Sequence, residues 1–456
     1  MSSTPSQERT QRLAFAGAAA ALVALVVATH FVRLPEPLGV DQGLFACFAR
    51  WVPRGWLPYR DLFDSKPPLF LYWWGASAVV PGDVVRAAWW WELFWLGGTL
   101  GAAYALASRV WGRWEGLAAA ALLFLGLWSP AWGAFWSRAQ AEEVLALPMI
   151  ASAWLALRAV DRTRLALWSG VFVGLCGLFK IPSMAIALSW AVTWLACLPS
   201  RRAAERVGLM VAGAAAPWAL ALAWFAAHGA TRVFVEGILV YHRYNASFIT
   251  PPWGGVLRDF AVKMVTEAPL LLVLAAVGVL RLFRSGAREA HWLAAWIVAT
   301  MAAVILQRQL AGYHYMLTVP GLAVAGAYGL ADIARSARVP GKRRLAAGAG
   351  ILAVLLFTAR DAAAWWRAYS PDLDYLRGRL PRQAYLLAVQ QGDYSLSNEE
   401  QAASFLRAHT APGDGILVWG LSPGIYALSD RHPVTRFAFH KILMTDAPLS
   451  RMWPGL

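Results

Sequence analysis

Long apolar stretches, separated by short polar segments, follow one another along most of the chain. A helix that crosses a lipid bilayer needs about 20 mostly apolar residues, so each stretch is a candidate transmembrane helix. The stretch 165–198 is too long for one helix, and Lys180-Ile181-Pro182 divides it into a tight hairpin. The pattern predicts a mainly α-helical, polytopic protein with about eleven transmembrane helices. Their apolar cores fall at about 12–32, 84–108, 116–135, 143–158, 165–179, 182–198, 206–228, 267–283, 291–307, 315–333 and 345–359.

The composition supports a membrane protein and excludes several other classes. Apolar residues make up 59% of the 456 residues, charged residues make up 15%, and the mean hydropathy is +0.48. Soluble globular proteins carry about 25% charged residues. A soluble enzyme, a disordered regulator and a secreted disulfide scaffold are therefore excluded for the chain as a whole. Cys176 and Cys197 lie within apolar stretches and Cys47 stands alone, so the cysteines predict no metal site.

The basic residues are placed as a topology signal. A formal net charge of +15 would suit a nucleic-acid-binding protein if the chain were soluble. In a polytopic membrane protein, Lys and Arg collect instead in the short cytoplasmic loops. We therefore expect a multi-pass protein of a bacterial inner membrane, with a cytoplasmic N-terminus, an extracytoplasmic C-terminal tail and no nucleic-acid partner. The basic connectors contain Arg109 and Arg113, Arg158 to Arg164, Arg201 to Arg206, Arg281 to Arg288, and Arg335 to Arg344.

The opposite side receives longer loops with most of the remaining carboxylates, so we expect function on the extracytoplasmic face. Its first loop covers residues 33–83, and apolar residues recur there at helical spacing. That spacing predicts an amphipathic helix lying at the membrane interface. Asp41 precedes this helix and could be its N-cap. Lys66, before two prolines, could be an interfacial anchor. The apolar residues of the expected helix are Leu44, Phe45, Phe48, Trp51 and Val52.

Two domains are expected, a membrane domain over 1–360 and a small soluble extracytoplasmic α/β domain over 361–456. In the tail, Ser397-Asn398-Glu399-Glu400 has the form of a capping box before a helix that runs to about Ala408. The turn Pro412-Gly413-Asp414-Gly415 is followed by an apolar strand, Ile416 to Trp419. The chain ends soon after these strand signals, which leaves open that the domain is incomplete.

The first loop contains Asp41-Gln42-Gly43 and, further on, Lys66-Pro67-Pro68. This arrangement resembles the family 39 group of the GT-C superfamily of membrane glycosyltransferases, which includes protein O-mannosyltransferases and the lipid A aminoarabinose transferase. The family carries an acidic pair at the first position, whereas this chain has Gln42 in place of the second acid. The resemblance covers about residues 12–360. Weaker matches are Glu142 and Glu143 in SRAQAEEVLALP, Lys180 in GLCGLFKIPS, and Tyr313 and His314 in GYHYMLTVP.

The resemblance implies an inverting transfer of a sugar from a polyprenyl-phosphate-linked donor to an acceptor hydroxyl of a glycan, lipid or protein. The leaving phosphate needs cations to stabilise its charge, and the attacking hydroxyl needs a carboxylate base. No cofactor is firmly implied, no metal ligands are assigned, and a divalent metal is compatible with the reaction. The resemblance assigns catalysis to Asp41, Glu142 and Glu143; donor phosphate binding to Lys66, Lys180, Arg60 and His314; and substrate binding to Gln42, Tyr59, Asp64 and Tyr313.

Alternatives remain for several of these residues and for the function. Asp64 could serve turn formation, Arg60 could pair with Asp64, and His314 could be an interfacial polar residue. A polytopic transporter or lipid flippase would also contain about eleven spans. Transporters tend to place charges near the bilayer midplane within paired halves, whereas the candidate charges here lie at the ends of spans and no internal repeat is evident. A large separation between Asp41 and Lys66 in a structure would favour this alternative.

Overall fold

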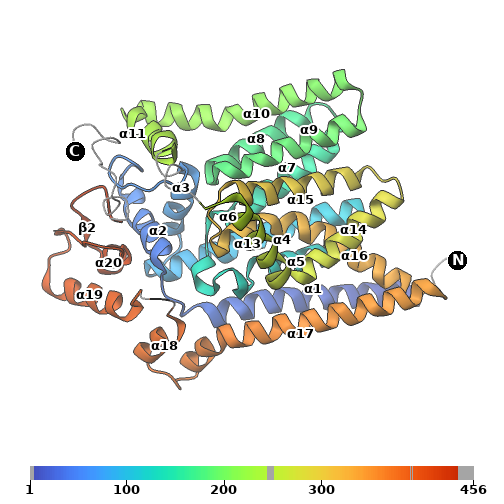
Figure 1. The fold of residues 1–456 in the computed structure, drawn as a ribbon. Coiled ribbons are helices and arrows are strands. Elements are labelled where there is room, and N and C mark those ends of the chain that lie inside the picture. The colour runs from blue at the N-terminus through green and yellow to red at the C-terminus, as the bar shows by residue number, and fades with distance from the viewer. Residues whose placement is uncertain (1–4, 244–250, 391, 393, 440–456) are drawn as a thin grey trace.

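A computed structural model describes residues 5–243, 251–390, 392 and 394–439 of the chain. Long helices lie side by side in a bundle, with the N-terminus at one end and the C-terminal tail at the other (Figure 1). Each of the predicted apolar stretches corresponds to one long helix of this bundle. These helices are α1 (Pro5–Arg33), α4 (Val84–Val110), α5 (Arg113–Leu127), α7 (Ala146–Ala159), α8 (Leu165–Phe179), α9 (Ile186–Cys197), α10 (Ser200–Ala227), α14 (Pro269–Arg284), α15 (Glu289–Leu306), α16 (Val319–Ser336) and α17 (Lys342–Leu376).

Shorter elements connect these helices. At the end of the bundle that carries the tail, they are α2 (Val40–Trp51), α3 (Pro68–Ala76), α6 (Ala141–Val144), α11 (Thr231–Val235) and α13 (Trp253–Glu267). Single helical turns are η1 (Val52–Arg54), η2 (Ser77–Val79), η3 (Pro130–Trp132), η4 (Ala134–Ser137), η5 (Ile181–Ala185), η6 (Glu236–Val240) and η7 (Gly312–Thr318). The tail contains α18 (Arg382–Val389), α19 (Leu396–His409), β1 (Gly415–Ile416), α20 (Gly424–Ser429) and β2 (His432–Pro433), and β1 pairs with β2 in parallel.

The mainly helical membrane fold is confirmed, whereas the number of spans stays a prediction. Among the described residues, six helices are long and apolar enough to cross a membrane by themselves, and the bent pair α13 and α14, at 94°, would make a seventh. Helices α8 and α9 are apolar but shorter. They are short because the chain breaks at Lys180, as the sequence predicts, so that α8 ends at Phe179 and η5 begins at Ile181.

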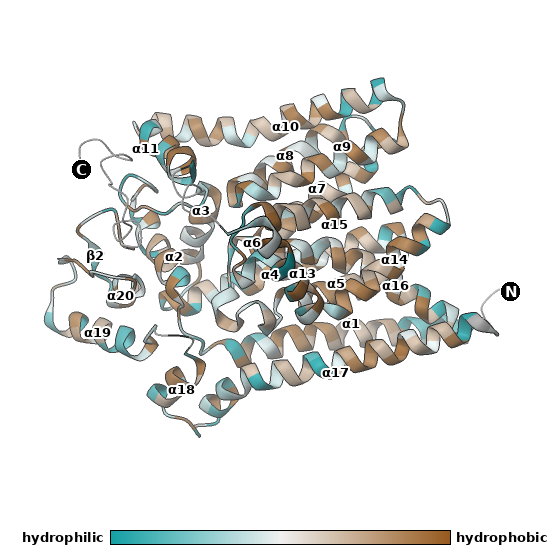
Figure 2. Ribbon diagram, viewed as in Figure 1, coloured by the Kyte–Doolittle hydropathy of each residue, from teal (hydrophilic) through white to brown (hydrophobic). Residues whose placement is uncertain are grey.

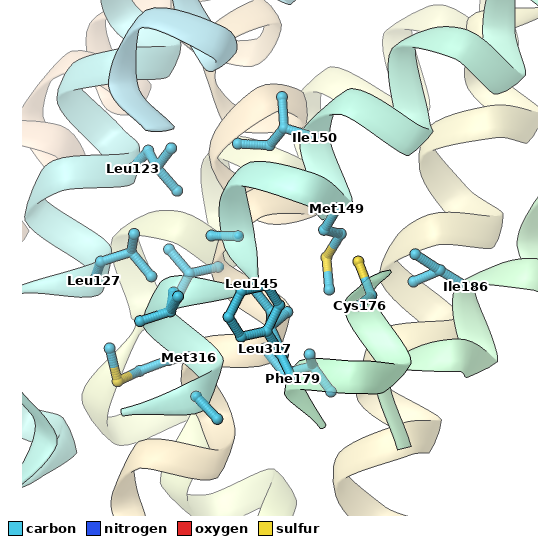
Figure 3. Packing of buried hydrophobic residues seen from close by; sticks show 14 of the residues in the cluster. Leu123, Leu127, Leu145, Met149, Ile150, Cys176, Phe179, Ile186, Met316 and Leu317 are labelled. Carbon is cyan, nitrogen blue, oxygen red and sulfur yellow. The ribbon is translucent and has the colours of Figure 1, made fainter. Parts of the chain in front are cut away.

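Apolar side chains fill the space between the bundle helices. Figure 3 shows Leu123 and Leu127 of α5, Met149 of α7, Cys176 and Phe179 of α8, and Leu317 of η7 in one continuous cluster. Hydrophobic residues dominate the middle of the bundle, and hydrophilic residues gather at its two ends and over the tail (Figure 2). One of these two polar ends is the end of the bundle that carries the tail.

Helix α2 differs from the expected interfacial helix. Nearly all of its residues are buried, because α3 and α4 pack on it from the bundle and α20 of the tail packs on it as well. Its apolar residues face protein and not lipid. The N-cap is Gly39, and no side chain caps the helix, so the expectation that Asp41 caps it is wrong. Asp41 lies within the first turn of α2.

The tail is docked on the first loop. Arg54 forms two hydrogen bonds with Asp430, at 2.9 and 3.2 Å, and Arg50 Nε donates to the carbonyl oxygen of Ala427 at 3.1 Å. A Cβ atom on Gly43 would come within 2.7 Å of the Gly424 backbone nitrogen. Glycine at position 43 is therefore what lets α2 approach the backbone of α20 this closely.

Details of the expected tail are corrected. Helix α17 runs to Leu376, so the boundary at 360 falls inside a helix. The cap of α19 is Ser395, whose hydroxyl accepts from the Asn398 backbone N–H, and not Ser397. The strand predicted over Ile416 to Trp419 is limited to Gly415–Ile416. The order helix, turn, strand, helix is as predicted, and residues 440–456 lie outside the described part of the chain.

Candidate active site

Side chains from five separate segments converge at the tail end of the bundle. We call this group the outer cluster, and its members are Asp41 of α2, Asp64 and Lys66 of the loop before α3, Glu142 of α6, Lys180 between α8 and η5, and Tyr313 and His314 of η7. Lys180 Nζ forms an ion pair with Glu142 Oε1, and His314 Nε2 lies 3.8 Å from the same oxygen. Helices far apart in the sequence therefore deliver opposite charges to one place.

Asp41 lies within this group and not at a distance from Lys66. Its Oδ2 atom accepts from Gln140 Nε2 at 3.4 Å, and the Tyr313 hydroxyl lies within hydrogen-bonding reach of its carboxylate. Its charge also acts on the ammonium groups of Lys66 and Lys180. The large separation between Asp41 and Lys66 that would have favoured a transporter is not found.

Lys66 is held in place by its backbone and by the ring beneath it. Its Nζ atom lies 3.9 Å from Asp64 Oδ2 and 5.0 Å from the centre of the Phe45 ring. The Tyr59 hydroxyl donates to the Lys66 carbonyl oxygen at 2.7 Å. Burial lowers the pKa of the ammonium group, but the carboxylates of Asp64 and Asp41 outweigh it and raise the pKa above its ordinary value. Lys66 therefore remains a cation.

The sequence around Lys66 explains this geometry. Pro67 is the N-cap of α3 with an extended backbone, and Pro68 is its first residue. Proline suits this position because the first helical residues need no N–H donor, and it restricts the residue before it to extended conformations. Lys66 therefore projects from an extended segment directly before a helix.

An apolar groove of about 410 Å³ lies on the bundle helices that follow Lys66 and precede Lys180. It is formed by α3, α8 and α10, and its lining includes Pro68, Tyr72, Leu178 and Trp224. Pro68 lies two residues after Lys66, and Leu178 lies two residues before Lys180. The chain therefore leads from each lysine to the lining of the groove within two residues.

Besides Glu143, three of the residues assigned from the sequence do not contribute side chains to the cluster. The guanidinium of Arg60 is bonded to Asp61, at 2.8 and 2.9 Å, and does not pair with Asp64. The Gln42 amide donates to the carbonyl oxygens of Phe135, Trp136 and Arg138, at 2.8 to 3.0 Å. Gln42 therefore fixes α2 to η4 and to Arg138, which follows it. Tyr59 packs against Phe225 and Phe234 and acts on the site through the Lys66 backbone.

Glu143 points away from the outer cluster. Its Oε1 atom accepts from Trp128 Nε1 and its Oε2 atom accepts from the Ala139 backbone N–H, both at 2.9 Å. It belongs to a second group, the buried arginine network, with Arg138 at its centre. Arg138 contacts Glu92 Oε2 at 2.6 Å and Glu36 Oε2 at 2.9 Å. Glu142 and Glu143 are adjacent in sequence and yet serve different groups.

Arg138 and Gln140 are not among the residues predicted from the sequence, although they lie in the same SRAQAEE segment as Glu142. Both are fully buried. An arginine and a glutamine in a short polar turn between two apolar stretches were the available signal, because such groups are buried only with partners. Arg138 anchors the segment to Glu36 and Glu92, and Gln140 reaches Asp41.

No group of three or more His, Cys, Asp or Glu side chains within the described ranges is arranged to hold a metal ion. What the outer cluster offers is two lysine ammonium groups, several carboxylates and a neighbouring apolar groove. Such a set can bind an anionic head group attached to a long apolar chain, and it can accept a proton.

Comparisons with known proteins identify the fold. Neither a protein-family model nor a curated protein sequence matches the chain. The crystal structure of ArnT from Cupriavidus metallidurans bound to undecaprenyl phosphate is similar, with 16% identity, coverage of 91% of this chain and 85% of that one, and a TM-score of 0.58. The apo form of the same protein gives 15% identity, coverage of 92% and 86%, and a TM-score of 0.56.

The apo oligosaccharyltransferase from Archaeoglobus fulgidus is also similar, with 13% identity, coverage of 91% of this chain and 64% of that one, and a TM-score of 0.49. The argument for the fold rests on the two ArnT structures, which align over most of both chains. The chain therefore has the GT-C fold of ArnT.

Proposed function

We propose that the protein is a membrane glycosyltransferase that moves a sugar from a polyprenyl-phosphate-linked donor to an acceptor hydroxyl. The observation that carries this proposal is the meeting of Asp41, Lys66 and Lys180, with an apolar groove lined by residues two positions from each lysine in the sequence. A cationic site for a phosphate, a carboxylate base and a channel for a lipid tail are what such a reaction needs. The GT-C fold, and the undecaprenyl phosphate named for the ArnT structure, support the same assignment.

The two lysines are assigned to the donor phosphate. When the glycosidic bond breaks, negative charge grows on the phosphate oxygens, and a cation already in place stabilises that charge. Lys66 lies directly before α3 and Lys180 directly after α8, and both helices contribute residues to the groove. The prenyl chain would lie along α3, α8 and α10, where Tyr72 and Trp224 mark the groove wall. His314, 3.8 Å from Glu142, would border the phosphate.

Asp41 is assigned as the general base. The acceptor oxygen attacks the anomeric carbon, the bond from that carbon to the phosphate oxygen breaks, and the acceptor proton passes to the Asp41 carboxylate. The bonding electrons leave with the phosphate, which stays on the lipid. One displacement inverts the anomeric configuration and requires no covalent intermediate. Glu142 forms an ion pair with Lys180 and would orient the acceptor. Glu143 is not assigned this role, because its two carboxylate oxygens already accept hydrogen bonds from Trp128 and Ala139.

The reaction is assigned to the extracytoplasmic face. The outer cluster and the tail share one end of the bundle, and the N-terminus lies at the other end (Figure 1). The short connectors at the N-terminal end carry the arginines, for example between α4 and α5 and between α14 and α15. Cytoplasmic loops are enriched in Lys and Arg, which makes that end the cytoplasmic one and supports placement in a bacterial inner membrane.

A transfer assay tests this function. Membranes containing the protein are supplied with a panel of radiolabelled undecaprenyl-phosphate sugars, and label is followed into lipid, glycan and protein fractions. We expect transfer from at least one donor, and a fall of about 10²–10³-fold in Lys66→Ala, as for loss of a single oxyanion donor. Lys263→Ala on α13 is the matched control, because Lys263 lies outside the outer cluster.

Two outcomes would contradict the proposal. Label that crosses the membrane without being transferred would indicate a transporter or flippase. Unchanged transfer in Lys66→Ala, with the protein folded in the membrane, would remove Lys66 from the phosphate site and leave it as an anchor.

A further inference from the structure

Gln140 contacts Asp41, and its amide group forms hydrogen bonds through the NH2 group but not through the oxygen atom. It is the N-cap of α6 and fully buried. Its Nε2 atom donates to the Trp136 carbonyl oxygen at 3.1 Å and to Asp41 Oδ2 at 3.4 Å. Its Oε1 atom accepts no hydrogen bond from any residue that the structure describes. A buried acceptor without a donor is costly, so this oxygen needs an explanation.

The orientation of the Gln140 amide follows from its neighbours. A carbonyl oxygen and an ionised carboxylate can only accept hydrogen bonds. The NH2 group must therefore face Trp136 and Asp41, since a flipped amide would place oxygen against oxygen at both contacts. The Oε1 atom then points away from both partners. The same two contacts that orient Asp41 thus leave the Oε1 acceptor of Gln140 buried and without a donor among the described residues.

Two other buried acceptors of the outer cluster are in the same condition. Asp64 Oδ2 and Glu142 Oε2 receive no hydrogen bond from the described part of the chain. Lys180 is engaged with the other oxygen of Glu142, and Lys66 lies 3.9 Å from Asp64. The cluster therefore offers unsatisfied acceptors beside its cations, and a bound group that brings several hydrogen-bond donors would satisfy them.

Gln42 provides a contrast within the same fold. Its Oε1 atom is also without a donor, but it lies against the backbone of its own helix. A Cβ atom on Gly39 would come within 2.6 Å of it and within 2.7 Å of the Trp136 ring. The Gln42 oxygen is therefore closed in by protein. Only Gln140 of the two glutamines contacts the Asp41 carboxylate.

We propose that Gln140 is a sugar-binding residue whose Oε1 atom accepts a hydrogen bond from a hydroxyl group of the substrate. Its NH2 group at the same time fixes the Asp41 carboxylate beside that hydroxyl. The inference rests on the proposed glycosyl transfer, and it adds a residue that recognises a sugar hydroxyl. The hydroxyl belongs either to the donor sugar or to the acceptor, since both must come close to Asp41 in the reaction.

Binding and kinetics with purified protein in nanodiscs test this role. The probes are undecaprenyl-phosphate mannose, glucose and galactose, and undecaprenyl methyl phosphate, a phosphodiester of equal charge without a sugar. The variant is Gln140→Met, which keeps the length of the side chain and removes both the Oε1 acceptor and the NH2 donor. Gln42→Met is the matched control.

For a donor-sugar hydroxyl, Gln140→Met should weaken the best sugar-linked probe by about 10-fold, about 1.4 kcal/mol, with undecaprenyl methyl phosphate affected less than about 2-fold. For an acceptor hydroxyl, donor binding should stay unchanged and the KM for the acceptor should rise by a similar factor. In both cases Gln42→Met should not discriminate between probes with and without a sugar.

Equal losses for both kinds of probe in Gln140→Met, or no change in binding and in acceptor KM, would overturn the proposal. This failure is distinct from failure of the proposed function. If the proposed function were wrong, the wild-type protein would itself bind the sugar-linked probes no better than undecaprenyl methyl phosphate, and it would transfer no sugar.

Discussion

Replacing Asp41 by Asn separates a catalytic carboxylate from a structural one. The substitution keeps the size of the side chain and its ability to accept from Gln140, and it removes the negative charge and the basicity. Because the N-cap of α2 is Gly39, no cap is lost. What α2 loses is the favourable interaction of a first-turn acid with the helix dipole, which is worth about 0.3–1 kcal/mol.

The effect on transfer should be much larger than this effect on folding. A positioned general base contributes about 10²–10⁴-fold to the rate, which corresponds to about 3–5 kcal/mol of transition-state stabilisation. Donor binding should persist, because Lys66 and Lys180 keep Asp64 and Glu142 as neighbours. We therefore expect a fall in kcat of about 10²–10⁴-fold, with the midpoint of thermal unfolding nearly unchanged.

The assay is single-turnover transfer from a saturating polyprenyl-phosphate sugar, with thermal unfolding measured on the same preparations. Asp61→Asn is the matched control, because Asp61 lies in the same loop and is bonded to Arg60 outside the cluster. Near-normal transfer by Asp41→Asn would refute its role as base. An equal loss in Asp61→Asn would show that the loop tolerates no such change and that the effect is structural.

Three further predictions concern packing, the two neighbouring glutamates and the tail. Gly43→Ala should lower the free energy of unfolding by about 1–3 kcal/mol, and with it the unfolding midpoint, because its Cβ would meet the Gly424 backbone at 2.7 Å. Gly17→Ala, whose Cβ meets nothing within 4 Å, should not lower the midpoint. Equal midpoints for the two variants would contradict the close approach. Glu143→Gln should keep near-normal sugar transfer, whereas Glu142→Gln should lose most of it, since only Glu142 pairs with buried Lys180. A larger loss of transfer in Glu143→Gln than in Glu142→Gln would contradict the assignment of Glu142 to the outer cluster. Burial raises the pKa of Glu399 to about 7 from 4.5, although Tyr394 and the Gly424 backbone N–H lower it. Between these two pH values the Glu399 carboxyl keeps its proton in the folded tail and releases it in the unfolded tail. The free energy of unfolding therefore falls as the pH rises from 4.5 to 7, by up to about 3 kcal/mol. Limited proteolysis of the tail should be faster at pH 7.5 than at pH 5, and a pH difference that persists in Glu399→Gln would rule out this group as its cause.

The sequence predicts the bundle well, because a membrane helix is defined by a local property of its own residues. Each apolar stretch became a helix, and the break at Lys180 is where the proline after it predicts. The role of α2 could not be predicted in the same way. Its apolar positions have helical spacing whether lipid or protein covers them, and α20, which covers them here, lies at the far end of the sequence.

In the candidate site, too, some residues could be predicted from local sequence and others depend on distant contacts. Lys66 and Lys180 were identified from motifs, and the structure brings them together with Asp41. The difference between Glu142 and Glu143 was not predictable, because neighbouring residues on a helix point about 100° apart and the orientation of α6 depends on distant contacts. Arg138 sets that orientation through Glu36 and Glu92, and neither glutamate stands out in the sequence as its partner.

A structure of the purified protein with undecaprenyl phosphate bound, determined by electron cryomicroscopy in nanodiscs, tests the central claim most directly. The account predicts phosphate oxygens within about 3 Å of both Lys66 Nζ and Lys180 Nζ, with the prenyl chain in the groove between α3, α8 and α10 and with Asp41 beside the phosphate. A phosphate bound elsewhere, with the outer cluster unchanged from the arrangement described above, would contradict the account.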